Sequence, residues 1–298
     1  MNNFIIILLY LIIGILLRRI NFPKDTGNVL NLFVIYLSLP ALILLKIPEL
    51  LFSAALLIPA LMPWVMLLLS AGLILILSKR FKWERPVTGA LLLLVPLGNT
   101  SFLGIPMVQS FFGSQAVSFA VLYDQLGSFL ALATYGSLII ALYGPSEARL
   151  TILGVGKKIV TFPPFLALIS ALILKDYSYP LILQTLFHSL AETLVPLVMV
   201  AVGFQLTLRV EKYLGLPLCI GLSIKLVIAP LTALLLCRLM GLSGLAAAVS
   251  IFEAGMPPMV SAGALAILAG FVPPLTAALV GLGIVLSFIT LPLLYHLL

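Results

Sequence analysis

The amino-acid sequence predicts an all-α polytopic membrane protein with ten transmembrane helices, arranged as an inverted 5+5 repeat in which helices 4 and 9 are broken and cross. Three observations lead to this prediction: few charges, long apolar runs, and helix breakers at matching places in two of the runs. Only 8% of the residues are charged and 63% are hydrophobic, whereas a soluble domain carries roughly 25% charged residues. The surface of the chain is therefore expected to face the lipid bilayer.

The apolar runs are long enough to cross a membrane, because a hydrocarbon core of roughly 30 Å is spanned by about 20 apolar residues in a helix. The net charge of +7 comes from basic residues in short loops between the runs. We interpret these residues as topology signals and expect no nucleic-acid partner. The runs are 4–17, 28–45, 53–78, 87–112, 117–143, 159–174, 181–207, 214–237, 243–270 and 273–295.

The basic residues also predict the orientation of the chain. With the N-terminus outside, most lysines and arginines fall on the cytoplasmic side, as the positive-inside rule requires. We therefore expect both termini outside the plasma membrane, the inner membrane of a bacterial cell. The cytoplasmic group is Arg18, Arg19, Lys24, Lys79, Arg80, Lys82, Arg85, Arg149, Lys157, Lys158, Arg209 and Lys212; the outer group is Lys46, Lys175 and Arg238.

The two halves of the chain resemble each other in the placement of their breakers. When the chain is slid over itself so that Pro40 meets Pro196, Asn99 falls beside Ala254–Gly255. Each half has an odd number of helices, so the second half must be inverted, as in many secondary transporters. The predicted parts are a first repeat (1–145), a cytoplasmic connector (146–158) and a second repeat (159–298).

The fourth and ninth runs carry Pro and Gly near the middle of the membrane, so we expect interruptions at 98–106 and 253–258. Proline removes a backbone donor and glycine permits non-helical backbone. Pro106 and Pro257 are each placed to begin a restarted half-helix, whose N-terminus would favour an anion. The competing interpretation is two proline kinks that neighbouring Ser and Thr side chains repair.

Polar side chains beside the two breaks make up the predicted substrate site. The carbonyl groups of unwound backbone, together with short polar side chains, suit a cation or the polar groups of a ligand. Lys225, in the eighth run, is a candidate partner for a substrate carboxylate or for a buried acid. The substrate-binding candidates are Asn99, Thr100, Ser101, Pro106, Lys225, Gly255 and Pro257.

Ionisable residues within membrane spans are costly and usually mark function. Here they are Asp124, His188, Glu192, Lys225 and Glu253. Glu253 adjoins the ninth break and is the first candidate for coupling to H⁺ or Na⁺, against a role as a helix cap. His188 and Glu192 stand one turn apart and could satisfy each other or lie at a dimer surface. Three acids with one lysine cannot all stay charged in the membrane, so protons or a bound cation are expected.

The segment Gly98-Asn99-Thr100-Ser101-Phe102-Leu103-Gly104-Ile105-Pro106 strongly resembles the auxin efflux carrier family, which includes bacterial malonate and malate permease-like proteins. Tyr123-Asp124 and Glu253–Pro258 also resemble it. The resemblance implies an inverted 5+5 fold shared with bile acid/sodium symporters. Helices 1, 2, 6 and 7 would then form a scaffold, and helices 3–5 and 8–10 a moving domain.

The resemblance also implies a function. The chain would be a secondary active transporter of a small organic anion, a carboxylate that is auxin-like or malonate- or malate-like, working by alternating access. Asp124 would face the break, and Ser128 and Thr134 would join Asn99 and Glu253 as ligands of Na⁺. No cofactor is expected other than Na⁺ or H⁺ as the coupling ion. A homodimer is compatible with the family.

Other functions fit the sequence less well than this one. An intramembrane metalloprotease needs a His-Glu-x-x-His ligand set, and the only histidines are His188 and His296, so no enzyme is expected. A channel or a sensor of the same fold stays open, because crossed broken helices can line a pore. A Na⁺/H⁺ antiporter is the third reading, disfavoured by the single acid in the fifth helix.

Overall fold

The computed structural model describes residues 2–20, 22–51, 53–144, 152–206, 211 and 214–298. All regular secondary structure in these ranges is helical, apart from one isolated antiparallel bridge between Gly98 and Pro258. Arg149, Arg209 and Lys212, on which the predicted orientation partly rests, lie outside the described residues, as do residues 146–151 of the predicted connector.

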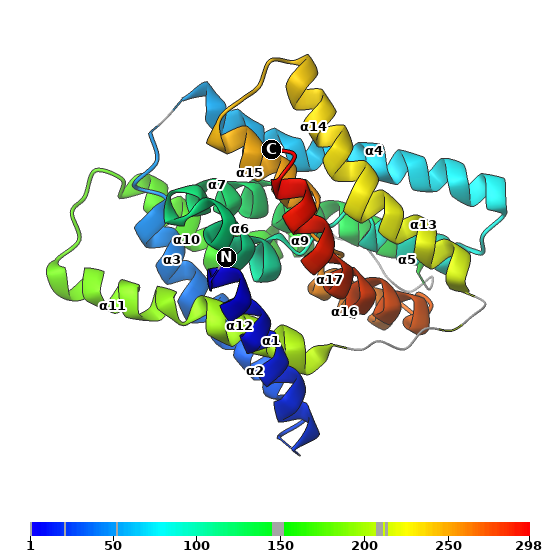
Figure 1. Ribbon diagram of the computed structural model, residues 1–298, viewed down its shortest axis with the longest axis horizontal. Coiled ribbons are helices and arrows are strands. Elements are labelled where there is room, and N and C mark those ends of the chain that lie inside the picture. Colours follow the sequence, from blue (N-terminus) through cyan, green and yellow to red (C-terminus); the bar gives the residue numbers. More distant parts are fainter. Residues whose placement is uncertain (1, 21, 52, 145–151, 207–210, 212–213) are drawn as a thin grey trace. The chain divides into compact units, whose positions relative to one another are not determined.

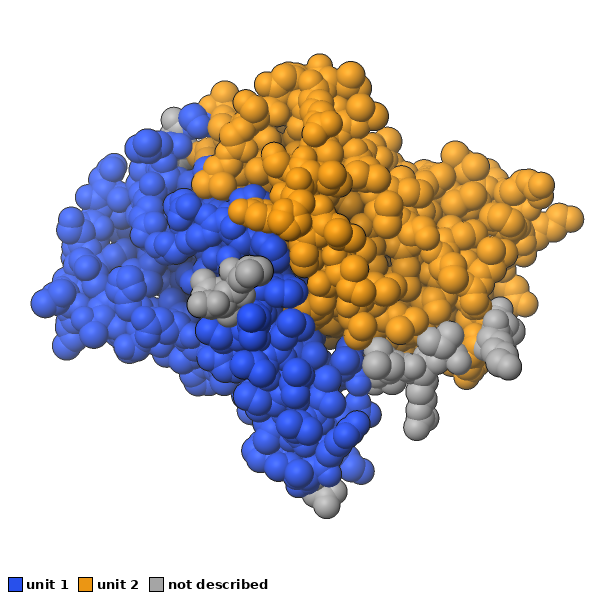
Figure 2. Space-filling view, in the orientation of Figure 1, with its two compact units in different colours: residues 1–53, 101–121, 157–206 blue, residues 54–100, 122–156, 207–298 orange. Residues whose placement is uncertain are grey.

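The chain folds into two compact units, each made of several segments (Figure 2). Unit 1 holds Met1–Ser53, Ser101–Val121 and Lys157–Leu206, and unit 2 holds Ala54–Thr100, Leu122–Gly156 and Thr207–Leu298. The chain passes from unit 2 to unit 1 between Thr100 and Ser101. The predicted division into two repeats, with scaffold and moving helices, stays a prediction.

The helices of unit 1 come from the first, second, sixth and seventh apolar runs and from the end of the fourth (Figure 1). They include one π-helical turn, η1. Their bounds are α1 Asn2–Arg19, α2 Thr26–Phe33, η1 Val34–Ser38, α3 Leu39–Lys46, α6 Ile105–Phe112, η4 Ser114–Ala116, α10 Pro163–Ile173, α11 Leu181–Glu192 and α12 Leu194–Gln205. α7 Val117–Leu122 and α9 Ile152–Val160 are each divided between the two units.

Within unit 1, α1 and α12 pack with their backbones in close approach, and glycine makes this possible (Figure 1). A Cβ atom added to Gly14 would lie 2.1 Å from the Val200 carbonyl oxygen, and one added to Gly203 would lie 2.0 Å from that of Leu11. Small residues at a helix interface are the usual way for membrane helices to gain packing contacts.

Unit 2 contains the third, fifth, eighth, ninth and tenth runs and the start of the fourth. Its helices are η2 Ala54–Leu56, α4 Leu57–Phe81, α5 Arg85–Leu94, η5 Tyr123–Phe129, η6 Leu132–Gly136, α8 Ser137–Tyr143, α13 Gly215–Ser223, η8 Ile224–Ile228, α14 Ala229–Leu239, α15 Leu245–Ala254, α16 Val260–Leu268 and α17 Pro273–Tyr295. η3 Thr100–Gly104 begins in unit 2 and continues into unit 1.

The core of unit 2 surrounds α5, whose residues Leu91–Leu94 are all at most 1% exposed. This helix packs against α4, α8, α13, α16 and α17. Burial on all sides is expected of a helix that is apolar on all faces. α5 thereby holds the unwound segment that follows it at a fixed place within unit 2.

Among the described residues, six helices are long and apolar enough to cross a membrane: Thr26–Lys46, Ala54–Phe81, Ser114–Tyr143, Leu181–Gln205, Gly215–Leu239 and Pro273–Tyr295. A seventh span forms if Leu153–Val160 and Pro163–Ile173, which meet at a bend of 64°, are counted together. The chain is therefore an all-helical, multi-span membrane protein.

Candidate functional site

Both predicted interruptions are present in the structure, but the first is displaced: of the predicted residues 98–106, only 98 and 99 lie outside helical backbone. α5 ends at Leu94, and helical backbone resumes at Thr100. α15 ends at Ala254, and helical backbone resumes at Val260. Two unwound segments, 95–99 and 255–259, therefore lie within unit 2.

The two unwound segments pair with each other. The Asn99 N–H donates to the Pro257 carbonyl at 2.8 Å, and the Met259 N–H donates to the Leu97 carbonyl at 3.0 Å. Gly98 and Pro258 form the antiparallel bridge between these bonds. Backbone groups in a membrane must be satisfied within the protein, and here each break satisfies part of the other.

The prediction that Pro106 and Pro257 begin the restarted half-helices is wrong. Pro106 is the second residue of α6, which continues directly from the π-helical turn η3 that begins at Thr100. The π turn changes the hydrogen-bond register just where an α-helix would clash with the proline ring. Pro257 lies in the unwound segment, because the following proline disfavours helical backbone at that position.

A buried polar cluster surrounds the paired segments. Asp124, on η5, is 1% exposed and accepts hydrogen bonds from Thr100 Oγ1 and from Gln125 Nε2, each at 2.6 Å. Both carboxylate oxygens of Asp124 thus receive a donor, which stabilises its ionised form. Thr100 in turn is held by η3, directly after the first break.

Glu253 differs from Asp124 in its hydrogen bonding. Its side chain is fully buried, and neither carboxylate oxygen has a hydrogen-bond partner among the described residues. Asn99, 2% exposed, likewise has no partner for its amide Nδ2. Buried polar groups without partners are rare and call for a specific explanation, such as an unseen ion, water or ligand.

Lys225 supplies the positive charge of the cluster. It lies on η8, is 4% exposed, and its Nζ donates to the Ala254 carbonyl at 3.3 Å. Lys225, Asp124 and Thr100 are all placed by π-helical turns. Such turns occur frequently at functional sites, and the sequence did not reveal them.

A small cavity of about 10 Å³ lies in the cluster. This volume approaches the minimum that a single water molecule needs. The polar side chains among its lining residues are Thr100, Tyr123, Ser128, Lys225 and Glu253. The structure thus brings most of the predicted coupling residues together and adds the buried Tyr123, which the sequence analysis quoted only as part of a motif.

Three further candidates have other surroundings. Gly255 is buried, and a Cβ atom there would come within 2.9 Å of Leu294 Cδ2. Thr134 is exposed, and its hydroxyl donates to the Leu130 carbonyl at 2.6 Å instead of lining the cavity. Ser101 is half-buried and begins the second segment of unit 1.

Unit 1 contains a larger cavity, of about 500 Å³. Pro106, Gln109 and Ser110, which follow one face of α6, line it. Its other polar lining residues are Tyr10, Lys46, Ser114, His188 and Glu192. His188 and Glu192 therefore face a cavity within their own unit. Gln109 and Ser110 were missed in the sequence, although they stand three and four residues after Pro106, which is the spacing of one helical face.

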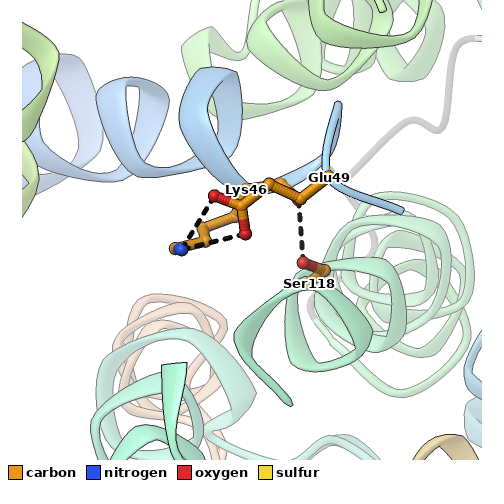
Figure 3. A network of polar contacts seen from close by, with 3 residues as sticks. All are labelled: Lys46, Glu49 and Ser118. Atoms are coloured by element: carbon orange, nitrogen blue, oxygen red, sulfur yellow. Dashed lines mark hydrogen bonds and ion pairs between the residues drawn. The ribbon is translucent and has the colours of Figure 1, made fainter. Parts of the chain in front are cut away.

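Lys46 lines this cavity, and its ammonium group is paired with an acid. Its Nζ lies 3.0 Å from both carboxylate oxygens of Glu49, and the Ser118 hydroxyl donates to the Lys46 carbonyl at 2.8 Å (Figure 3). The cavity thus has a cation whose charge is partly neutralised by an acid that is 55% exposed.

Comparisons with known proteins agree along nearly the whole chain. The profile of a family described as membrane transport protein matches residues 1–295. An uncharacterized transporter of Methanocaldococcus jannaschii is 28% identical over 268 residues, which cover 86% of this chain and 85% of that protein. An uncharacterized transporter of Methanothermobacter thermautotrophicus is 26% identical over 292 residues, which cover 96% of this chain and 94% of that protein.

Proposed function

Because the chain belongs to the membrane transport protein family, we propose that it is a secondary active transporter that moves a small organic anion by alternating access. That it is a membrane transporter and not an enzyme follows from the family and from both relatives. The resemblance to auxin efflux carriers is confirmed at the level of this family. The malonate- or malate-like substrate and the symporter-like fold belong to the proposal.

The observation that carries the proposal is the pairing of two interrupted segments beside unpartnered polar groups. Asn99 places an amide Nδ2 without a partner directly at the pairing, and Glu253 adds a buried carboxylate without a partner. In secondary transporters, broken helices of this kind form the substrate and coupling-ion sites near the middle of the membrane. A purely structural kink would leave no reason to bury these groups unsatisfied.

The cavity of unit 1 supports a small solute as the transported species. Its volume of about 500 Å³ falls within the usual range of ligand pockets, roughly 300–1,000 Å³. Most of its wall is apolar, with a few polar groups that could orient a ligand. Lys46 and His188 are the side chains there that suit a carboxylate.

Ten spans, in an inverted repeat with both termini outside the plasma membrane, remain the proposed topology. Besides the six or seven long apolar helices, α1 has 18 residues, and two interrupted pairs, α5 with α6 and α15 with α16, are available. With the bent pair counted as the seventh span, α1 and these two pairs bring the number of proposed spans to ten. Homodimer formation is a separate prediction.

Coupling to H⁺ or Na⁺ is assigned to Glu253 in this proposal. If Asp124 and Lys225 are both charged, the cluster is neutral only when Glu253 is protonated or paired with a cation. An uncompensated buried charge is strongly unfavourable. The proton or cation on Glu253 would therefore be bound and released during the transport cycle, as the site opens to one side of the membrane and then to the other.

Uptake of labelled mono- and dicarboxylates into proteoliposomes, under imposed pH and Na⁺ gradients, tests the proposal. Saturable uptake that Asn99→Ala lowers at least about 10-fold, with little change in melting temperature, is expected. The control is Asn28→Ala, which removes an exposed amide whose Oδ1 accepts from Gln205. Single-channel currents, or uptake of the same rate in Asn99→Ala, would contradict the proposal.

A further inference from the structure

The position of the Lys225 ammonium group points to a role beyond neutralising an acid. We propose that Lys225 Nζ occupies the place of a coupling cation at the paired breaks, so that the protein works with H⁺ and without Na⁺. The role of this cation in a transport cycle rests on the proposed function. The binding site itself is defined by the structure of unit 2.

The carbonyl contact of Lys225 is the one that a bound cation would make. Ala254 is the last residue of α15, and its carbonyl accepts from Lys225 Nζ. The two carbonyls before it, of Phe252 and Glu253, accept instead from the N–H groups of Gly255 and Met256. The C-terminal end of a helix carries partial negative charge, so a cation there is stabilising, and half-helix C-termini bind coupling cations in transporters.

The space around the ammonium group is fitted to it. A Cβ atom added to Gly98 would lie 3.0 Å from Lys225 Nζ, so a larger residue at this point of the first break would crowd the ammonium group. Lys225 is 4% exposed. The ammonium therefore lies near Gly98 of the first unwound segment and is bonded to the end of α15, directly before the second.

The remaining groups of the small cavity complete a cation site. Lys225 and Glu253 line the same cavity of about 10 Å³, together with the hydroxyl-bearing Thr100, Tyr123 and Ser128. These oxygens are the ligand types that a hard cation prefers. With the lysine present, a second cation would be repelled, and the space left suits a water molecule or a proton on Glu253.

Thr134 fits the same conclusion. The resemblance to sodium symporters made Thr134 a predicted Na⁺ ligand, but its hydroxyl is bonded to the Leu130 carbonyl on an exposed face. The lysine is the cation that the described cluster contains.

Cation-dependent melting of the purified protein tests the proposal without measuring transport. The wild type is expected to melt at the same temperature in NaCl, KCl and choline chloride of equal ionic strength. Lys225→Ala should melt at a lower temperature, and Na⁺ or methylammonium, but not the larger choline, should raise it again. Na⁺ should bind to this variant on the order of 100-fold more tightly than to the wild type.

Two further variants control the result. Lys157→Met removes an exposed lysine and should leave the melting behaviour unchanged. The double variant Lys225→Ala, Glu253→Gln removes the acid as well, so the response to Na⁺ and methylammonium should disappear. If the wild type shows no saturable uptake while these cation responses are intact, the proposed function is contradicted but this inference is not.

Two results would overturn the inference. One is stabilisation of the wild type by Na⁺ over choline, which would show that Na⁺ binds beside the lysine. The other is an equal response of Lys225→Ala to Na⁺, methylammonium and choline. If Lys225→Ala does not fold, the melting temperatures of the wild type and of Lys225→Met, which keeps most of the side-chain volume, still test the assignment. A wild type whose melting temperature is raised specifically by Na⁺ contradicts it. A wild type whose melting temperature does not depend on Na⁺ supports it.

Discussion

The buried cluster of unit 2 and the cavity of unit 1 differ in size and in the satisfaction of their charges. The cluster encloses about 10 Å³ and buries Asp124, Lys225 and Glu253 almost completely. The cavity measures about 500 Å³, and its lysine is paired with the half-exposed Glu49. A small closed space suits a proton or a water molecule, whereas the larger cavity suits an organic solute. Under the proposed function, this difference would let coupling and substrate binding use partly separate groups of residues.

Removal of Asp124 should have the largest effect. In Asp124→Ala, the buried side chains of Thr100 and Gln125 both lose their acceptor. A buried donor left without its acceptor costs roughly 1–3 kcal/mol, and this variant leaves two, so thermal or denaturant unfolding should show a strongly destabilised protein that does not transport. Glu192→Ala, in the cavity, is the matched control and should unfold nearly as the wild type does. Equal destabilisation by both variants would contradict the comparison.

Glu253→Gln should separate coupling from stability. The amide keeps the shape of the side chain but cannot titrate, so uptake should lose its dependence on an imposed pH gradient, while the melting temperature is retained. Wild-type uptake should rise as the side from which substrate enters is acidified, and uptake by the variant should not. Glu84→Gln, at the exposed start of α5, should respond as the wild type does. A full pH response in Glu253→Gln would move the coupling role to Asp124.

Much of the fold was predictable, because apolar length and breakers are local properties of the sequence. The prolines and glycines of the fourth and ninth runs correctly indicated two interruptions. The restart at Thr100 was not predictable, since it depends on the bond from Asn99 to Pro257, residues far apart in the chain. The predicted ligand role of Thr134 came from resemblance alone, and the direction of its hydroxyl is set by its own helix.

The candidate site was predictable in its charged members and not in its arrangement. Asp124, Lys225 and Glu253 stand out in any apolar sequence, because ionisable residues in membrane spans are rare. The sequence could not show that Asp124 is fully hydrogen-bonded while Glu253 is not, since the donors Thr100 and Gln125 are ordinary polar residues. Nor could it show a cavity in unit 1, because its lining is mostly apolar and comes from several helices.

Filling the cavity should have a moderate effect on transport and little on stability. Ser110→Phe places a ring at the half-buried lining of α6, so solute binding should weaken about 10-fold, read as a higher KM for uptake. The pH dependence that Glu253 confers should persist. Thr185→Phe, at an exposed position of α11 outside the lining, controls for the added ring. An unchanged KM in Ser110→Phe would exclude this cavity as the solute site.

The smallest effect is expected at Lys46 and Glu49. Their ion pair is partly exposed, and such pairs contribute only about 0.2–1 kcal/mol to stability, so Glu49→Gln should melt close to the wild type. The Ser118 hydroxyl still holds the Lys46 backbone, which keeps the lysine beside the cavity.

With its acid neutralised, the ammonium should attract an anionic substrate more strongly, and KM should fall about 2–3-fold at low ionic strength. The gain should shrink in high salt, because exposed charges are screened over about 10 Å at 0.1 M. Lys46→Gln should raise KM instead. If Glu49→Gln raises KM, or lowers it equally at all salt concentrations, Lys46 does not act on the substrate through its charge.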